Sequence, residues 1–226
     1  MADPKISFAR RREWSMVPSE APLCGPAARR ADAMAAATAA PRAFVGADCF
    51  GAAAARAAAA ALESAGFAVT WLAKPRDGTS DPAALPYYEA AEKVASRVAC
   101  DPGINPCDAE GLPRRVGVLA CGTGAGVCMV ANKHPGVRAA VCLGADDAAD
   151  ARSINDANVL CLAGLRSTPG AAAAAAKAFA ATRFGAPCAA SGGEAWGEAE
   201  SAFLRESGPA LAAAGSRLAA SAQQVP

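Results

Sequence analysis

The stretch "RVGVLACGTGAGVCMVANKHPG", residues 115–136, decides the fold. It opens with an apolar run that ends at Cys121, passes through glycines at 122, 124 and 126, and then becomes apolar again over a helical length. A continuous apolar run before a glycine turn and a helix is typical of a buried parallel strand and its crossover helix. We therefore predict a strand over 115–121, with a helix directly after the loop.

The same alternation of strand and helix extends on both sides of this stretch. Four more strands are expected, at 42–48, 67–73, 136–143 and 158–164. Helices are expected at 50–66, 85–99, 147–155 and 169–185, with an exposed, proline-rich loop at 101–115. Apolar strands that alternate with helices predict an α/β fold: a three-layer sandwich with a five-stranded, mostly parallel sheet and helices on both faces.

The chain divides into three regions by composition. Residues 1–42 carry many arginines without periodicity, so they are either a disordered extension or an organelle transit peptide, and both readings stay open. Residues 43–190 hold the predicted α/β domain. Residues 191–226 are expected to form a tail of one or two helices.

Charge and composition exclude several classes of function. The 22 basic and 21 acidic residues give a net charge of +1, and aromatics make up 5%, so we expect no direct nucleic-acid binding. No uninterrupted apolar run is long enough for a membrane span. The odd number of cysteines, 9, and the single histidine, His134, predict no metal site and an intracellular, reducing compartment, cytoplasmic or plastid.

The glycine loop suits an anion or a developing oxyanion, because its backbone N–H groups are open to close approach. It lacks the G-K-[ST] ending of a nucleotide-binding P-loop, and its glycine spacing does not fit a dinucleotide fingerprint. Cys121 stands directly before it. A thiol there is either a base or nucleophile of lowered pKa or a buried, inert side chain, and the residues alone leave both open.

Three motifs carry a family resemblance: "CGTGAG", "ANKHPGVRAA" and "NDANVL". Together they resemble the ribose-5-phosphate isomerase type B family, which includes the galactose-6-phosphate isomerase subunits. The resemblance implies a Rossmann-like sandwich and a homodimer with shared active sites. It also implies interconversion of aldose and ketose phosphates through an enediol, without a metal or an organic cofactor, so a small sugar phosphate is the expected ligand.

The resemblance also implies roles for particular residues. Cys121 corresponds to the base that moves a proton between C1 and C2, with Thr123 orienting the thiol or a substrate hydroxyl. Asp48 corresponds to the acid that contacts the ring oxygen and hydroxyls. The remaining expected substrate contacts are Cys49, Gly122, Gly124, Gly126, Asn155, Lys133, Arg152 and Arg166.

Some positions depart from the family pattern. Cys49 replaces a histidine that faces phosphate, and Ile154 replaces the histidine that opens the sugar ring. Arg166 is shifted by one place, and an arginine-rich segment near the family's C-terminus is missing. With these departures, the sequence resembles the plant and algal branch called DNA-damage-repair/toleration proteins. Three hypotheses follow: an isomerase, a sugar-phosphate-binding protein without turnover or with altered specificity, and a structural subunit.

Overall fold

The computed structural model describes residues 39–76, 81, 85–99 and 107–222, with side chains described as far as residue 211. The chain separates into two units after Ala39, and the unit Ala40–Pro226 holds all of the described helices and strands. The expected extension over 1–42 therefore falls almost wholly outside the described residues, as does much of the loop predicted at 101–115.

A five-stranded sheet forms the middle layer, and all of its pairings are parallel. The strand order is β2-β1-β3-β5-β4. The strands are β1 (Arg42–Ala47), β2 (Ala68–Ala73), β3 (Arg115–Cys121), β4 (Ala139–Cys142) and β5 (Val159–Ala163). The predicted fold class is confirmed.

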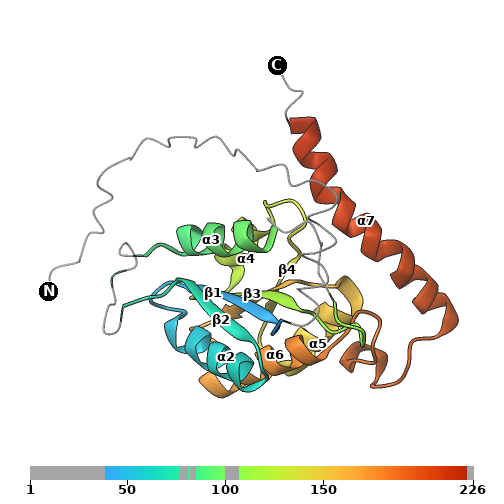
Figure 1. Ribbon diagram of the computed structural model, residues 1–226, viewed down its shortest axis with the longest axis horizontal. Helices are drawn as coiled ribbons and strands as arrows, with labels where there is room; N and C mark the ends of the chain where they lie inside the picture. Colours follow the sequence, from blue (N-terminus) through green and yellow to red (C-terminus); the bar gives the residue numbers. More distant parts are fainter. Residues whose placement is uncertain (1–38, 77–80, 82–84, 100–106, 223–226) are drawn as a thin grey trace, which may run out of the picture. The chain divides into compact units, whose positions relative to one another are not determined.

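Helices cover both faces of the sheet (Figure 1). On one face lie α3 (Tyr87–Ala99) and α4 (Ala125–Ala131), and on the other lie α2 (Ala52–Ser64), α5 (Ala145–Asn155) and α6 (Pro169–Ala181). A short 3₁₀ helix, η1 (Ala189–Ser191), and α7 (Glu198–Ala222) follow. Helix α7 lies within residues 191–226, the region for which a tail of one or two helices is expected.

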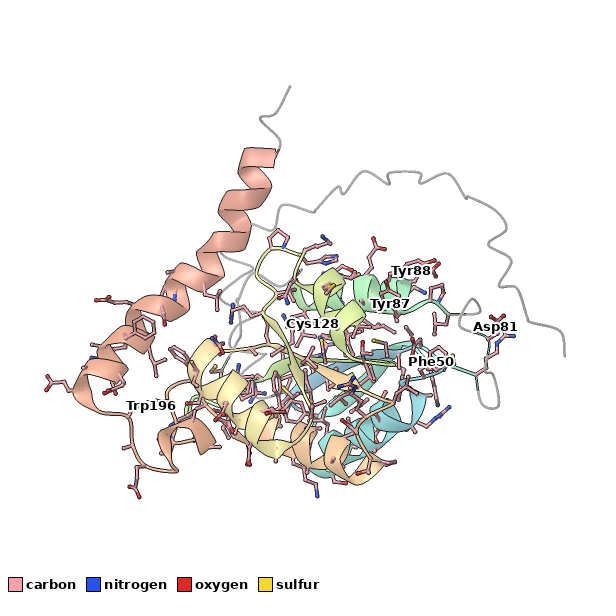
Figure 2. The ribbon with its side chains drawn as sticks, turned by 180° about the vertical axis from the view of Figure 1, so that it is seen from behind. Phe50, Asp81, Tyr87, Tyr88, Cys128 and Trp196 are labelled. Atoms are coloured by element: carbon pink, nitrogen blue, oxygen red, sulfur yellow. The ribbon has the colours of Figure 1, made fainter. Side chains whose placement is uncertain are left out.

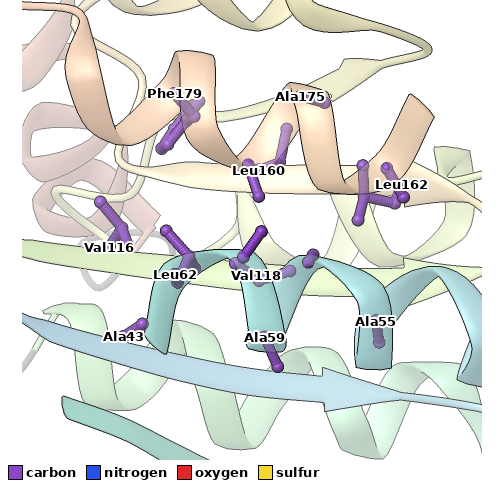
Figure 3. Close-up of a cluster of buried hydrophobic side chains, with 14 of the residues drawn as sticks. Ala43, Ala55, Ala59, Leu62, Val116, Val118, Leu160, Leu162, Ala175 and Phe179 are labelled. Carbon is purple, nitrogen blue, oxygen red and sulfur yellow. The ribbon is translucent and has the colours of Figure 1, made fainter. Parts of the chain in front are cut away.

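Alanine decides how closely the helices pack on the sheet. Figure 3 shows Ala55 and Ala59 of α2 beside Leu62, over the strands β1 and β3. Helix α6 packs against α2 and adds Ala175 and Phe179 to the same cluster. Small side chains allow close approach, while each fully buried Leu, Val or Phe contributes about 1.5–3 kcal/mol. This core fixes the carboxyl ends of the strands on which the site is built.

Candidate functional site

The turns that follow β1, β3 and β5 are pressed together at one edge of the sheet. Asp48 N donates to Ala120 O at 3.2 Å, and Gly164 N donates to Cys121 O at 2.8 Å. Side chains are excluded at this contact: a Cβ on Gly51 would lie 2.3 Å from the Ala120 carbonyl carbon. The glycines therefore bring Asp48 and the loop after Cys121 to the same place.

The glycine loop passes directly into α4. Gly124 has φ 75°, a left-handed conformation that favours glycine, and it precedes the first residue of the helix. Thr123 is exposed on the loop, and its Oγ1 accepts a hydrogen bond from Ala125 N at 3.4 Å. Gly122 lies beneath Leu165, whose Cδ1 would be 3.1 Å from an added Cβ. The predicted loop is thus present, with Thr123 as its solvent-facing side chain.

Cys121 is the last residue of β3 and is 5% exposed. Its neighbours form an apolar cluster with α3 and α4, in which Phe44, Val94 and Val127 take part. Cys121 therefore lies beneath the loop in mainly apolar packing, and only a small part of its surface is accessible to solvent.

Asp48 follows β1 and is 4% exposed. Its Oδ1 accepts a hydrogen bond from Gly51 N at 2.8 Å. Burial raises the pKa of the Asp48 carboxyl, while hydrogen bonds from the backbone of Gly51 and Phe50 work against that rise. A carboxyl with a raised pKa keeps its proton to higher pH and is suited to act as an acid. Its neighbour Cys49 is half-buried in the same turn.

A groove of about 640 Å³ runs from the loop along α5. Its volume is that of a typical small-molecule site. Two expected substrate contacts, Asn155 and Arg166, line it together with Thr123. Its other lining residues are Ala125, Val141, Leu143, Asp147, Asp150, Ala151 and Ile154. Among the described residues that line the groove, Arg166 alone carries a positive charge.

Several of these residues were not expected to belong to the site. Asp147, Asp150 and Ile154 are spaced three and four residues apart on α5, and positions with that spacing share one helix face. Helical periodicity would have revealed this stripe. The edge-strand residue Val141 could not have been found in this way, because its place at the edge depends on the strand order.

Arg152 lies inside the fold rather than in the groove. The side chain is 0% exposed, and Nη1 donates to Asp156 Oδ1 at 2.7 Å and to Ala157 O at 2.6 Å. Its guanidinium also lies 5.6 Å from the centre of the Phe179 ring. Arg152 therefore acts as a structural cation in this conformation.

Lys133 is likewise separated from the loop. It is exposed just beyond the C-terminus of α4, whereas the glycine loop precedes the N-terminus of that helix. A seven-residue helix is about 10 Å long. The structure thus brings Asp48, Cys49, Cys121 and the loop together. Thr123, Asn155 and Arg166 line the groove, whereas Lys133 and Arg152 lie elsewhere.

Among the described residues, no group of three or more His, Cys, Asp or Glu side chains is arranged to hold a metal ion. Within the same part of the chain, none of the helices has the length and apolar character needed to cross a bilayer.

The part of the chain that holds the glycine loop matches a known family model. The model is described as Ribose/Galactose Isomerase, and it matches residues 43–190. The chain belongs to this family. The match covers the whole sheet, the glycine loop and the groove residues. The family resemblance seen in the motifs is confirmed.

Members of the Ribose/Galactose Isomerase family are similar to this chain over limited stretches. The DNA damage-repair/toleration protein DRT102 of Arabidopsis thaliana is 42% identical over 121 residues, 54% of this chain and 36% of that protein. A probable ribose-5-phosphate isomerase B of Mycoplasma pneumoniae is 56% identical over 50 residues, 22% of this chain and 33% of the relative. The chain thus spans about a third of the length of these two relatives.

A solved structure of the family has the same fold. Ribose-5-phosphate isomerase B from Mycoplasma genitalium, with bound ribulose-5-phosphate, superposes with a TM-score of 0.54. The two chains are 30% identical, and the alignment covers 63% of this chain and 85% of that one.

Proposed function

We propose that this protein is an aldose–ketose isomerase that acts on a small sugar phosphate of the ribose 5-phosphate/ribulose 5-phosphate type. The observation that carries the proposal is the juxtaposition of Asp48, Cys121 and the glycine loop, in a chain of the Ribose/Galactose Isomerase family. The bound ribulose-5-phosphate in the related structure supports the same class of ligand.

The proposed reaction needs only proton transfers. The Cys121 thiolate removes the proton from C2 of the open-chain aldose, and the electron pair moves toward the carbonyl oxygen to give an enediolate. The N–H groups of the loop at 122–126 stabilise that negative charge. A proton then moves from the C2 hydroxyl to the C1 oxygen, and the thiol returns its proton to C1, which gives the ketose and regenerates the thiolate.

The other residues hold the sugar. Asp48, whose pKa burial raises, gives a proton to the ring oxygen or binds a hydroxyl. Thr123 and Asn155, which line the groove, offer hydrogen bonds to hydroxyls, and Arg166 binds the phosphate. With Ile154 in place of a proton-transferring histidine, ring opening is slow, so we expect preference for an open-chain substrate or another sugar.

The test is an isomerisation assay with ribose 5-phosphate and a panel of other pentose and hexose phosphates. Cys121→Ser is expected to lower turnover at least a hundredfold, because a serine hydroxyl is a far weaker base than a thiolate. Cys107→Ser is the matched control, since Cys107 is exposed and lies away from the groove. Full turnover by Cys121→Ser would refute the proposed base.

A second candidate function is binding of a sugar phosphate without turnover, or with altered specificity, in tolerance of DNA damage or stress. The apolar packing of Cys121 and the presence of Ile154 in the groove favour it. It predicts a raised melting temperature with sugar phosphates and no conversion of any of them. Charge balance gives no basis for direct binding to nucleic acid.

We further propose that residues 43–190 form the catalytic unit of a homodimer and that the protein works in the cytoplasm or a plastid. Val141 and Leu143 are 39% and 49% exposed at the groove, where a second copy would cover them. Light scattering of the purified chain tests the dimer. The mass of the mature chain distinguishes a retained extension from a transit peptide cleaved near residue 42.

A further inference from the structure

A pair of thiols lies between α4 and β5, apart from the proposed base. Cys128 is half-buried on α4 and is labelled in Figure 2. Cys161 is fully buried in the middle of β5, on the sheet face that α4 covers. Cys128 packs against the buried cluster that contains Cys161, and the Cys161 thiol lies close enough to lower the pKa of Cys128. Two thiols from different elements are therefore neighbours in one cluster.

Asn132 completes the surroundings of Cys128. Its Nδ2 donates to Cys128 Sγ at 3.4 Å and to Ala139 O at 2.9 Å, and its Oδ1 accepts from Ala139 N at 2.8 Å. The side-chain amide is thus fixed by β4 with an N–H directed at the sulfur. When protonated, Cys128 Sγ itself donates to Ala139 O at 3.3 Å. This arrangement holds the sulfur in one orientation.

The hydrogen bonds favour the thiolate of Cys128. The Cys161 thiol, followed by the Asn132 amide, lowers the pKa of Cys128 to about 7, against the opposing effect of burial. Complete burial, followed by the neighbouring Cys128, raises the pKa of Cys161. The pair therefore consists of a nucleophilic sulfur, partly open to solvent, and a neighbouring thiol that keeps its proton.

Other described cysteines lack this combination. Cys107 is more exposed than Cys128, but burial of its sulfur and the nearby charge of Asp156 raise its pKa. Cys142 is buried, and its pKa is raised to about 12. Of Cys107, Cys128 and Cys142, exposure alone would single out Cys107 as the reactive thiol, whereas the lowered pKa singles out Cys128.

We propose that Cys128 and Cys161 form a peroxide-sensitive dithiol. The Cys128 thiolate attacks one oxygen of hydrogen peroxide, which breaks the O–O bond, gives a sulfenic acid at Cys128 and releases hydroxide. The Cys161 sulfur then attacks the sulfenic sulfur, and water leaves as the disulfide forms. In sum, two thiols are oxidised to a disulfide, and one peroxide is reduced to two waters.

The disulfide ties α4 to β5. Cys128 lies four residues after Gly124, so the tether acts on the helix that carries the glycine loop. The reaction itself does not require the proposed isomerase activity.

The test is peptide mapping by mass spectrometry of the full, folded chain after brief treatment with hydrogen peroxide. We expect a peptide crosslinked between Cys128 and Cys161, two hydrogens lighter than the sum of its parts. Cys161→Ala is expected to stop at the sulfenic acid, which dimedone traps at Cys128. Cys107→Ser is the matched control and should form the crosslink as the parent does.

A second measurement needs no variant. The rate of alkylation of Cys128 by iodoacetamide should rise with a midpoint near pH 7 and exceed that of Cys107 roughly tenfold at that pH. The proposal is overturned if Cys107 oxidises first, with Cys128 and Cys161 still reduced. It is also overturned if the crosslink forms only in urea, or if Cys128 alkylates no faster than Cys107.

Discussion

The aromatic ring of Tyr87 lies directly against the α-carbon of Gly126. A Cβ built on Gly126 would be 2.7 Å from Tyr87 Cε2 and 3.0 Å from Cδ2. Tyr87 begins α3 and is 41% exposed, whereas Gly126 belongs to the first turn after the glycine loop. Figure 2 labels this tyrosine beside Tyr88, with which it makes an edge-to-face contact. The side chain of one helix therefore rests on the start of another, next to the proposed oxyanion site.

Substituting Gly126→Ala should displace the Tyr87 ring. Because that ring is partly exposed and can swing away, we expect the free energy of unfolding to fall by about 1 kcal/mol. Turnover should fall more strongly, on the order of tenfold to a hundredfold, since the loop shifts with the helix. Steady-state kinetics and urea unfolding measure the two effects.

The control is Gly144→Ala, where an added Cβ meets no atom within 4 Å and the backbone is extended. It should match the parent in both measurements. In a Tyr87→Ala background, Gly126→Ala should lower turnover by a smaller factor than it does in the parent. Equal losses in both backgrounds would contradict the proposed contact.

Asp48→Asn should separate stability from turnover. The native state raises the pKa of Asp48 above the reference value of 3.8, so it binds this proton more tightly than the unfolded chain does. The parent therefore loses stability as pH rises from about 3.8 through the native pKa. The variant has no carboxyl at this position, so it does not lose this stability as pH rises. Its amide oxygen can still accept the hydrogen bond from Gly51 N.

Urea unfolding at pH 3 and pH 7 checks this expectation. The free energy of unfolding of Asp48→Asn minus that of the parent should be larger at pH 7 than at pH 3. Its turnover should fall about 10²–10⁴-fold, as expected for loss of an acid–base group. If this difference in the free energy of unfolding did not change with pH, it would show that burial does not raise the pKa of the Asp48 carboxyl.

Asp156→Asn should destabilise the fold through charge alone. Asp156 accepts from Arg138 Nη2 and from Arg152 Nη1, both at 2.7 Å, and the two arginine side chains are 6% and 0% exposed. Its φ of 47° lies in the left-handed region, which asparagine tolerates. Removing the carboxylate leaves two buried cations, at a cost of about 3 kcal/mol.

Denaturant titration measures that cost. Glu63→Gln, on the exposed end of α2, is the control and should stay within about 0.5 kcal/mol of the parent. If the two variants were equally stable, the buried ion pairs would be dispensable. High salt should relieve little of the loss, because buried charges are weakly screened.

Ile154→His should accelerate turnover of ring-form sugar phosphates. Ile154 lines the groove on the last turn of α5, and histidine there can move a proton to open the ring. We expect a gain of roughly tenfold to a hundredfold on cyclic substrates and little change on open-chain ones. Parallel assays with both kinds of substrate measure the difference, and an unchanged rate on cyclic substrates would contradict this role.

The strands could be predicted because continuous apolar runs mark them locally, but one boundary was wrong. We expected a strand over 136–143, whereas β4 begins at Ala139. Arg138 N donates to the side chain of Asn158, Oδ1, at 2.7 Å instead of joining a ladder. An apolar run indicates that a segment is buried, but it does not reveal which group accepts or donates each backbone hydrogen bond.

The same limit applies to the site. Asp48 and the glycine loop were found because each directly follows a strand, and parallel strands end at a common edge. Arg152 carries no such local signal. Its helix turns that position inward, where Asp156 four residues later provides the opposite charge.

By itself, the sequence determined the alternation of strands and helices and the family, because short-range patterns of apolar residues and glycines encode both. Only the tertiary structure decided the order of the strands, the groove between the loop and α5, and the packing of Cys128 against the cluster that contains Cys161. These depend on contacts between segments far apart in the chain, and such contacts form only when the whole core packs at once.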